Sequence, residues 1–309
     1  MPAYHVERSI IIDIPIERVQ NSLRDYKQWP HWSPWLIMEP DATLTYSDRQ
    51  GQVGANHGWS GVLIGAGSME LMEVHDDALH MQLTFVKPFK SQAKVGFKLE
   101  ALAYKTQVVW YMDGHLPFFM FWMTSKMKTF IGMDYERGLQ MLKEYLETGT
   151  VASYVHIEGT QTIPEQTYIG IPRTCNIKDI ASLMKKDFET LYAFMEQNNI
   201  SMDRVPFSIY NTFDIFKGTT DYVACIPYEE EVHIDASWVR GNIVKQNALK
   251  TMHKGRYLHL GNAWMTAMSF ARIQKIKLRK SPVGYEFYPN NPYDTPEEEL
   301  ITEIYLPLK

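Results

Sequence analysis

The sequence is poor in cysteine and in long apolar runs. Its 309 residues include only two cysteines, Cys175 and Cys225, which are too few for a disulfide framework. The longest apolar run covers residues 118–123, far short of the roughly 20 residues that span a membrane. The first ten residues, MPAYHVERSI, lack the charged segment and the apolar stretch of a signal peptide. We therefore expect reduced thiols, no membrane span and a cytoplasmic location.

An excess of positive charge is also missing. The formal net charge is −5 at pH 7, and the isoelectric point is about 6.1. Proteins that bind nucleic acid directly usually present a basic face to the phosphates. The charge balance therefore predicts no direct nucleic-acid partner.

Motifs that carry catalysis or hold cofactors are lacking as well. The ten histidines form no H-E-x-x-H motif, and the chain has no G-x-S-x-G elbow, P-loop or C-x-x-C pair. The sequence GAGSME at residues 65–70 lacks the third glycine of a nucleotide loop. His253 and His259 alone would lack a third ligand for a metal ion. The sequence thus predicts no metal site and no cofactor, and it identifies no catalytic residue.

Aromatic residues, in contrast, are abundant. They make up 13% of the chain, within a hydrophobic content of 45%. This composition suits bulky cores and also suits folds with large cavities to line. A chain of this length is typical of two domains of about 150 residues each. The small, polar stretch TGTVAS separates two halves with different patterns, so we place the domains at residues 1–148 and 153–309.

The first half has the pattern of a strand, a short helix, a meander of strands and a long helix. Short runs between residues 42 and 112 alternate with period two, as in Met81, Leu83 and Phe85. The long helix is indicated by apolar residues at steps of three and four: Ile131, Tyr135, Leu139, Leu142 and Leu146. Gly149 is a suitable C-cap for it. An amphipathic helix after an antiparallel meander is expected to pack on that sheet.

The second half shows the order strand, helix, strand, strand, and then shows it again. The first helix is indicated by one apolar face: Ile180, Met184, Phe188, Leu191 and Met195. The second helix lies in GNAWMTAMSFARIQKIKL, and the strands GYEFY and ELITEIYLPL follow it. This order suggests an internal duplication of a small unit. Both halves together predict an α+β protein.

Two carboxylates stand among aromatic residues in predicted strands. Glu286 lies in VGYEFYP, and Glu303 lies in TEIYLPL. Each of them either faces water from an edge strand or lies in a pocket, where aromatic rings help it to attract a cation. The local sequence leaves both interpretations open.

Three tryptophans gather in the stretch DYKQWPHWSPWL at residues 25–36. Trp29, Trp32 and Trp35 carry a large apolar area within seven residues. They can plug a core, wall a ligand cavity or meet a partner, and the sequence alone leaves these alternatives open.

The second half resembles the GyrI-like family of effector-binding domains. The resemblance rests on KGRYLHLGNAW (254–264), GYEFYPNNPYDTPEEEL (284–300) and TEIYLPL (302–308), and it covers residues 153–309. It implies a duplicated strand-helix-strand-strand fold with a cleft for lipophilic, often cationic or aromatic, small molecules. The acidic pocket residue of the family corresponds to Glu286. The candidate aromatic walls are Tyr288, Trp264, Tyr168 and Tyr210.

The first half resembles the START-like superfamily, in its polyketide cyclase/dehydrase (SRPBCC) group. The resemblance rests on WPHWSPW (29–35), GQVGANHGWSG (51–61), FVKPF (85–89) and GMDYERGLQMLKEYLE (132–147). It implies a helix-grip fold, in which a sheet wraps around a long C-terminal helix and leaves an apolar cavity. The tryptophan stretch would close one end of that cavity. Trp110, Phe85 and Trp59 are the candidates to line it.

These resemblances imply a cytoplasmic protein that binds a lipophilic small molecule, as a sensor or as a sequestering protein. Two alternatives stay open: a hydrolase of reactive electrophilic compounds with Glu286 as general base, and a protein-interaction module. In regulators, GyrI-like domains follow a DNA-binding helix-turn-helix. A START-like domain takes that place here, so direct control of transcription is not expected. The sequence names neither the ligand nor the oligomeric state.

Overall fold

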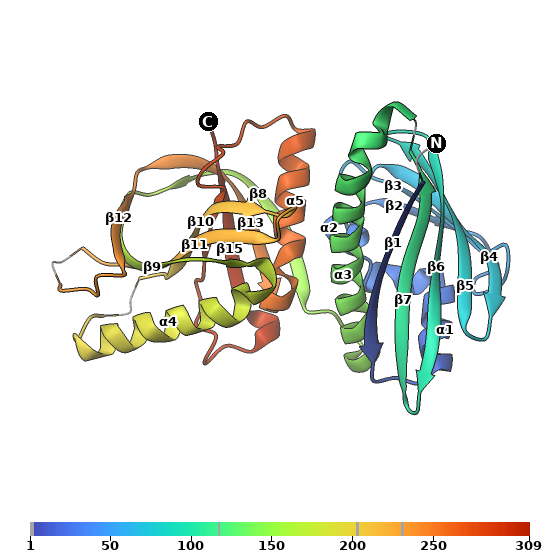
Figure 1. Ribbon diagram of the computed structural model, residues 1–309, viewed down its shortest axis with the longest axis horizontal. Helices are drawn as coiled ribbons and strands as arrows, with labels where there is room; N and C mark the ends of the chain where they lie inside the picture. Colours follow the sequence, from blue (N-terminus) through green and yellow to red (C-terminus); the bar gives the residue numbers. More distant parts are fainter. Residues whose placement is uncertain (1–2, 117, 202–203, 230–231) are drawn as a thin grey trace. The chain divides into compact units, whose positions relative to one another are not determined.

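The computed structural model describes residues 3–116, 118–201, 204–229 and 232–309 in two compact units. The first unit covers Met1–Val151, and the second covers Ala152–Lys309 (Figure 1). Each unit has its own sheet and its own hydrophobic core. Within the described ranges, no helix is long and apolar enough to cross a membrane.

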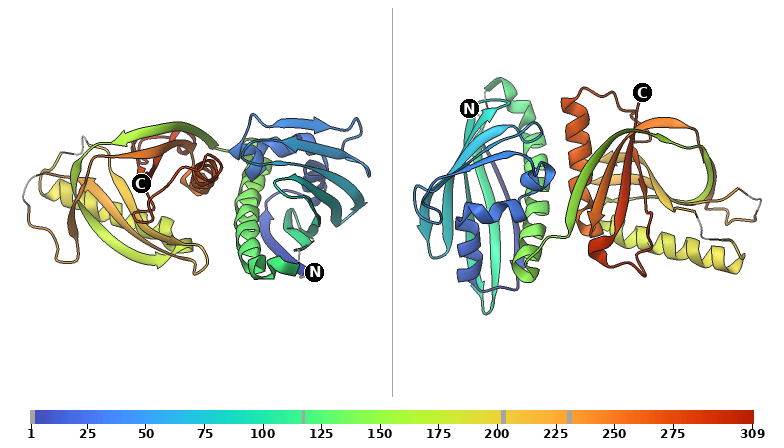
Figure 2. Two further views of the ribbon diagram at one scale, coloured as in Figure 1. Left: turned by 90° about the horizontal axis from the view of Figure 1, so that it is seen from above. Right: turned by 180° about the vertical axis from the view of Figure 1, so that it is seen from behind.

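The first unit is built on a seven-stranded antiparallel sheet that curves around a long helix (Figure 2). The strand order is β1-β7-β6-β5-β4-β3-β2. The strands are β1 (Ala3–Ile12), β2 (Thr43–Tyr46), β3 (Asn56–Ser60), β4 (Ala66–His75), β5 (Ala78–Lys87), β6 (Ser91–Leu102) and β7 (Lys105–His115). The helices are α1 (Ile16–Arg24), η1 (Tyr26–His31), α2 (Pro34–Met38), η2 (Phe118–Met123) and α3 (Thr124–Thr148).

The long helix α3 forms where the apolar stripe predicts it. It has 25 residues, and Tyr135, Leu139 and Leu142 of the stripe are buried against the sheet. It ends at Gly149, whose φ of 87° is left-handed and whose N–H donates to the Tyr145 carbonyl at 2.8 Å. The helix-grip arrangement of the first unit is therefore confirmed.

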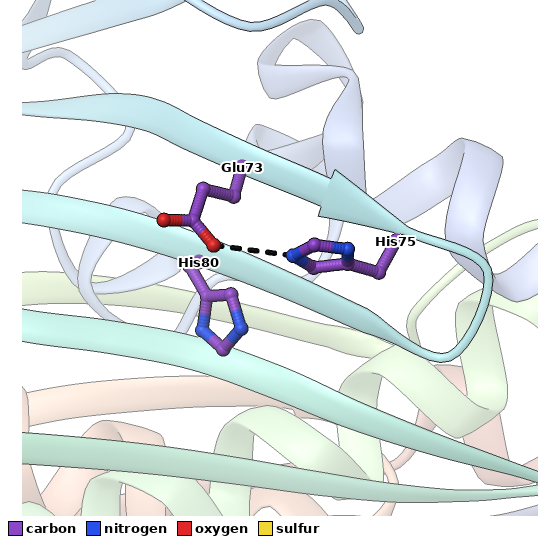
Figure 3. A group of neighbouring side chains, drawn as sticks. All are labelled: Glu73, His75 and His80. Atoms are coloured by element: carbon purple, nitrogen blue, oxygen red, sulfur yellow. Dashed lines mark hydrogen bonds and ion pairs between the residues drawn. The ribbon is translucent and has the colours of Figure 1, made fainter.

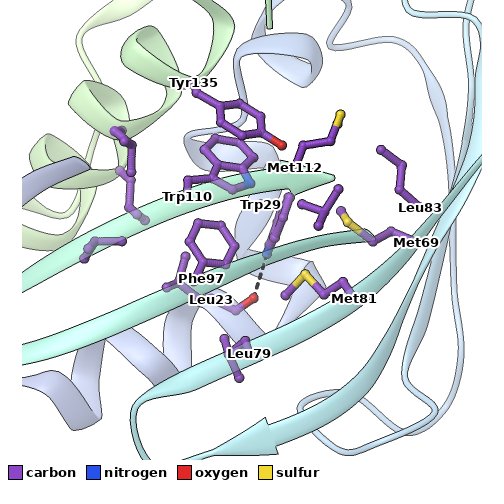
Figure 4. Packing of buried hydrophobic residues seen from close by; sticks show 14 of the residues in the cluster. Leu23, Trp29, Met69, Leu79, Met81, Leu83, Phe97, Trp110, Met112 and Tyr135 are labelled. Atoms are coloured by element: carbon purple, nitrogen blue, oxygen red, sulfur yellow. Dashed lines mark hydrogen bonds between the residues drawn. The ribbon is translucent and has the colours of Figure 1, made fainter. Parts of the chain in front are cut away.

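The tryptophans of residues 25–36 belong to the core of this unit. Figure 4 shows Trp29 between Phe97 and the other buried side chains of this core. Trp29 and Trp32 are buried, and Trp35 is half-buried. All three rings pack edge-on against Trp110, with centroids 5.6 to 6.0 Å from it. Trp110 in turn stacks on Tyr135 of α3 at 4.1 Å. Packed rings therefore fill the interior between the sheet and the helix at this point.

The second unit is built on an eight-stranded antiparallel sheet with two α-helices and three short 3₁₀ helices. The strands are β8 (Ser153–Ile163), β9 (Gln166–Asn176), β10 (Phe207–Asp214), β11 (Thr219–Pro227), β12 (Val239–Ile243), β13 (Gln246–Gly255), β14 (Gly284–Phe287) and β15 (Ile301–Pro307). The helices are η3 (Ile177–Asp179), α4 (Ile180–Gln197), η4 (Tyr257–His259), α5 (Leu260–Ile273) and η5 (Glu297–Glu299).

The topology of this sheet shows the internal duplication that the sequence suggests. Each repeat contributes two strands, one long helix and two more strands: β8-β9-α4-β10-β11 and β12-β13-α5-β14-β15. The spatial order is β12-β9-β11-β10-β14-β15-β13-β8, and it reads the same in reverse when each strand is exchanged for its counterpart. The strands β10 and β14 therefore meet in the middle of the sheet.

Two strands of this unit differ from the sequence-based expectation. The sequence indicates one strand region at residues 154–173, whereas the structure has two strands, because Pro164 and Glu165 interrupt the run. The short strand β12 is not indicated by the sequence at all. Its five residues, VRGNI, include a glycine and two polar side chains, which makes the strand signal weak.

The stability of both units should depend on pH, because each of them buries a histidine. Burial lowers the pKa of His57 in the first unit to about 4. In the second unit, burial and then the charge of His259 lower the pKa of His253 to about 4. The folded pKa lies below the unfolded value of 6.5, so the unfolded chain binds protons more readily between these two values. The contribution of each histidine to stability is therefore complete above pH 6.5 and is lost as the pH falls toward 4.

We expect each histidine to cost about 2 kcal/mol of unfolding free energy between about pH 7 and pH 5. Urea unfolding at the two pH values measures this loss. The variant His57→Phe replaces one ring by another that does not titrate. It should therefore remove the part of this loss that arises in the first unit. An unchanged pH dependence in His57→Phe would show that His57 is not the group that titrates.

Candidate functional site

Glu286 lies in the middle of the second sheet, on the face that α4 and α5 cover. It belongs to β14 and is only 3% exposed. Its strand neighbours Tyr285 and Phe287 point to the opposite face, where both belong to a separate hydrophobic cluster. Glu286 therefore lies in a central strand that is buried on both faces. The sequence left open whether this carboxylate faces water or is buried, and the structure shows that it is buried.

Three neutral side chains donate hydrogen bonds to the Glu286 carboxylate. The hydroxyl of Tyr288 donates to Oε2 at 2.7 Å, and the hydroxyl of Tyr210 on β10 donates to the same oxygen at 3.0 Å. The indole N–H of Trp264 on α5 donates to Oε1 at 2.5 Å. Gly284 makes room for this indole, because a Cβ atom there would lie 2.5 Å from the Trp264 ring.

Two opposing effects act on the charge of the Glu286 carboxylate. Burial raises the pKa of Glu286, and the three hydrogen bonds act against that rise. Burial, together with the charge of Glu286, also raises the pKa of Tyr210 and of Tyr288, so both hydroxyls stay protonated donors. The partners that the structure gives Glu286 bring no positive charge. An ionised Glu286 is thus stabilised by dipoles and remains uncompensated.

More aromatic side chains surround the carboxylate. Phe188 of α4 packs edge-on against Tyr288 with ring centroids 5.5 Å apart, and Tyr257 of η4 does so at 5.9 Å. The sulfur of Met184 lies 3.3 Å from the Tyr288 hydroxyl. Tyr257 is 36% exposed, so the aromatic group extends from Glu286 to the surface of the domain.

A surface hollow borders this group along α4. Its lining residues are Glu189, Tyr192, Ala193, Glu196, Ile200 and Tyr293. Tyr192 stacks on Phe188 at 6.0 Å, and Phe188 packs on Tyr288, so a row of rings leads from the hollow to Glu286. The carboxylates of Glu189 and Glu196 make the hollow acidic.

The structure brings together four of the side chains that the sequence singles out in the second half: Glu286, Tyr288, Trp264 and Tyr210. It does not bring Tyr168 to them. Tyr168 packs edge-on against Phe207 at 5.5 Å, in the cluster on the opposite face of the sheet.

The candidates in the first half lie in two places of the first unit. Trp110 is 1% exposed and is enclosed by other rings. Trp59 and Phe85 are half-buried and pack edge-on against each other at 6.0 Å. Of the three, Trp59 and Phe85 alone retain some exposed surface.

Sequence reasoning missed Met184, Phe188 and Tyr257 as neighbours of the carboxylate. The first two lie on the apolar stripe of the predicted helix, which is typical of an ordinary core face. Tyr257 stands in the KGRY segment that carries the family resemblance. Nothing local in the sequence shows that these helical residues lie against the face of the sheet that carries Glu286.

The structure is that of a protein with two α+β domains, the second of which buries a carboxylate. Residues 160–309 match the model of the GyrI-like small molecule binding domain. Residues 3–147 match the model of the family described as polyketide cyclase/dehydrase and lipid transport. The chain therefore combines one domain of each type. The curated proteins contain no match to the chain.

Among the solved structures, EcmrR in a complex with DNA is 18% identical, with a TM-score of 0.44. The alignment covers 60% of this chain and 65% of that chain, which is less than two thirds of its length. SAV2435 bound to tetraphenylphosphonium is 18% identical, with a TM-score of 0.40, over 50% of this chain and 94% of that chain. The Aha1 dimer from Colwellia psychrerythraea is 16% identical, with a TM-score of 0.36, over 47% of this chain and 98% of that chain.

Proposed function

We propose that the C-terminal domain binds a lipophilic cation at Glu286, and that the protein is a sensor or a sequestering protein for this small molecule. The observation that carries the proposal is a buried carboxylate, among aromatic rings, whose hydrogen bonds come from neutral donors. A cation with an apolar surface supplies the missing charge without bringing water. The match to a family of small molecule binding domains supports this proposal.

The cation reaches Glu286 along the row of rings. Tyr192 and Tyr257 lie at the surface end of this row, and the acidic hollow beside α4 attracts positive charge before binding. Aromatic faces then contact the cation on its way to the carboxylate. Because Tyr288 and Phe188 pack closely in the structure, binding requires that these rings move apart.

The N-terminal domain has a supporting role in this proposal. Trp59 and Phe85 are its candidates for contact with a second apolar ligand, because both are half-buried. We place the domains at residues 1–148 and 153–309. The cytoplasm is the proposed location, in keeping with the two free cysteines, Cys175 and Cys225.

Native mass spectrometry of the protein from its own host, followed by thermal-shift measurements, tests the proposal. We expect a co-purified small molecule, or a melting temperature that tetraphenylphosphonium raises and the anion tetraphenylborate does not. Turnover of an electrophilic compound would favour the hydrolase alternative. A stoichiometric protein partner, with no shift by either ion, would favour an interaction module.

A further inference from the structure

The hairpin of β4 and β5 carries a glutamate and two histidines on the outer face of the first sheet (Figure 3). Regular alternation along β4 would place Glu73 and His75 on the same face as Leu71, which is fully buried. The register with β5 shifts between Leu71 and Glu73, because Met72 forms a β-bulge. Beyond the bulge the alternation is reversed, and Glu73 and His75 are exposed.

The three side chains converge. Glu73 lies directly opposite His80 in the register, and His75 follows two residues later on the same face. One possible ligand atom from each residue lies within 4.8 Å of the other two. His75 Nε2 is 3.1 Å from Glu73 Oε2, and the rings of His75 and His80 are 5.6 Å apart.

Tyr111 sets the orientation of His80. His80, Gly96 and Tyr111 lie in one row across β5, β6 and β7. The Tyr111 ring lies over Gly96, where a Cβ atom would come within 2.5 Å of the hydroxyl. The hydroxyl oxygen is 2.5 Å from His80 Nδ1. When Nδ1–H donates to this oxygen, the lone pair of Nε2 is free to bind a metal ion.

The first helix holds the turn of this hairpin in place. The side-chain amide of Gln20 on α1 donates to the carbonyl oxygen of His75 at 2.5 Å and to that of Asp76 at 3.2 Å. The backbone beside the ligands is therefore fixed by a contact from outside the hairpin. A fixed backbone lowers the cost of ordering the ligands around an ion.

We propose that Glu73, His75 and His80 bind one divalent transition-metal ion, with Zn²⁺ as the ion that two imidazoles and a carboxylate suit. Water completes the coordination, since the side chains are at the surface. The ion joins β4 to β5 and stabilises the hairpin. Mg²⁺ does not bind here, because it prefers oxygen ligands in an octahedral arrangement.

The local charges make the metal–ligand bonds the main source of affinity. The pKa of Glu73 lies below its usual value, first because of the hydrogen bond with His75 and then because His80 and Lys94 are near. A glutamate side chain is ionised at neutral pH, as a metal ligand must be. The positive charge of Lys94 opposes a cation, so long-range attraction contributes little, and Zn²⁺ binding should depend only weakly on salt.

Isothermal titration of the full-length, tag-free protein with Zn²⁺ at neutral pH tests this proposal. We expect one Zn²⁺ per chain, visible absorption bands when Co²⁺ replaces it, and no heat with Mg²⁺. A wild-type protein that binds no Zn²⁺ overturns the proposal.

Variants locate the site. His75→Gln and His80→Gln should each weaken Zn²⁺ binding by about tenfold or more. Tyr111→Phe keeps the ring but loses the hydroxyl, and it should weaken binding by a smaller factor at unchanged stoichiometry. His5→Gln is the matched control, since His5 lies on the same sheet but pairs with Asp113 and Glu7.

The metal-free melting temperatures of the three histidine variants should stay near that of the wild type, because His5 and His75 are exposed and His80 is half-buried. Unaltered Zn²⁺ affinity in both His75→Gln and His80→Gln would overturn the proposal. An equal loss of affinity in His5→Gln would also overturn it, because the ion would then bind elsewhere on the sheet.

Discussion

Glutamine at position 286 should cost the protein most of its affinity for a lipophilic cation and little of its affinity for a neutral aromatic molecule. The change Glu286→Gln keeps the shape of the side chain and an oxygen that accepts from Tyr210 and Tyr288, but it removes the charge. A charge-assisted contact contributes about 1.5–3 kcal/mol, which corresponds to a loss of about ten- to a hundredfold. Titration calorimetry with tetraphenylphosphonium and with triphenylphosphine oxide measures the two affinities.

Glu303→Gln is the matched control for this experiment. Glu303 lies on the neighbouring strand β15, and its Oε1 is 2.8 Å from the ammonium group of Lys250. Its charge is already paired, so the same substitution should leave cation binding unchanged. Equal losses in the two variants, or equal losses for the cation and the neutral molecule, would contradict a charge role for Glu286.

Alanine at position 110 should destabilise the N-terminal domain more than any surface substitution. Trp110 is 1% exposed, stacks on Tyr135 and contacts the rings of Trp29, Trp32 and Trp35. Truncation of such a side chain removes apolar contacts and leaves a cavity, at a cost of about 3–5 kcal/mol. Urea unfolding should therefore show a lower midpoint for Trp110→Ala at an unchanged m-value.

Trp122→Ala provides the comparison. Trp122 is 61% exposed, so its removal should change the unfolding free energy by less than about 0.5 kcal/mol. If both variants unfolded at the same denaturant concentration, the aromatic cluster would not be the packed core that the structure shows.

The architecture was predictable because its signals are local and periodic. The stripe on α3, with Tyr135, Leu139 and Leu142, fixes which face of the helix is buried. The order of elements in the second half indicates a duplication, and the strand order shows it. The edge strand β12 was not predictable, since its five residues carry a glycine and few apolar side chains.

The burial and the partners of the two strand glutamates were not predictable from local sequence. Glu286 and Glu303 stand in similar short strand sequences, Glu286 beside Tyr285 and Glu303 two residues before Tyr305. Alternation shows which residues share a face, but it does not show which face is covered. Lys250 of β13 pairs with Glu303, whereas α4 and α5 cover Glu286 with rings and an indole N–H. Both outcomes depend on contacts between distant parts of the chain.

The cluster of Glu73, His75 and His80 escaped prediction for a different reason. Period-two alternation assigns Glu73 and His75 to the buried face of Leu71. The bulge at Met72 moves them to the outer face, and the absence of a side chain at Gly96 lets Tyr111 reach His80. A bulge depends on the pairing of two strands, which the alternation pattern within one strand does not contain.

The cation site at Glu286 is tested most directly by the ratio of two affinities of the wild-type protein. Tetraphenylphosphonium and tetraphenylborate have nearly the same shape and opposite charges, so their affinities differ chiefly through the charge of the site. A buried Glu286 carboxylate predicts that the cation binds at least about tenfold more tightly than the anion. Equal affinities, or tighter binding of the anion, would contradict a site built around Glu286.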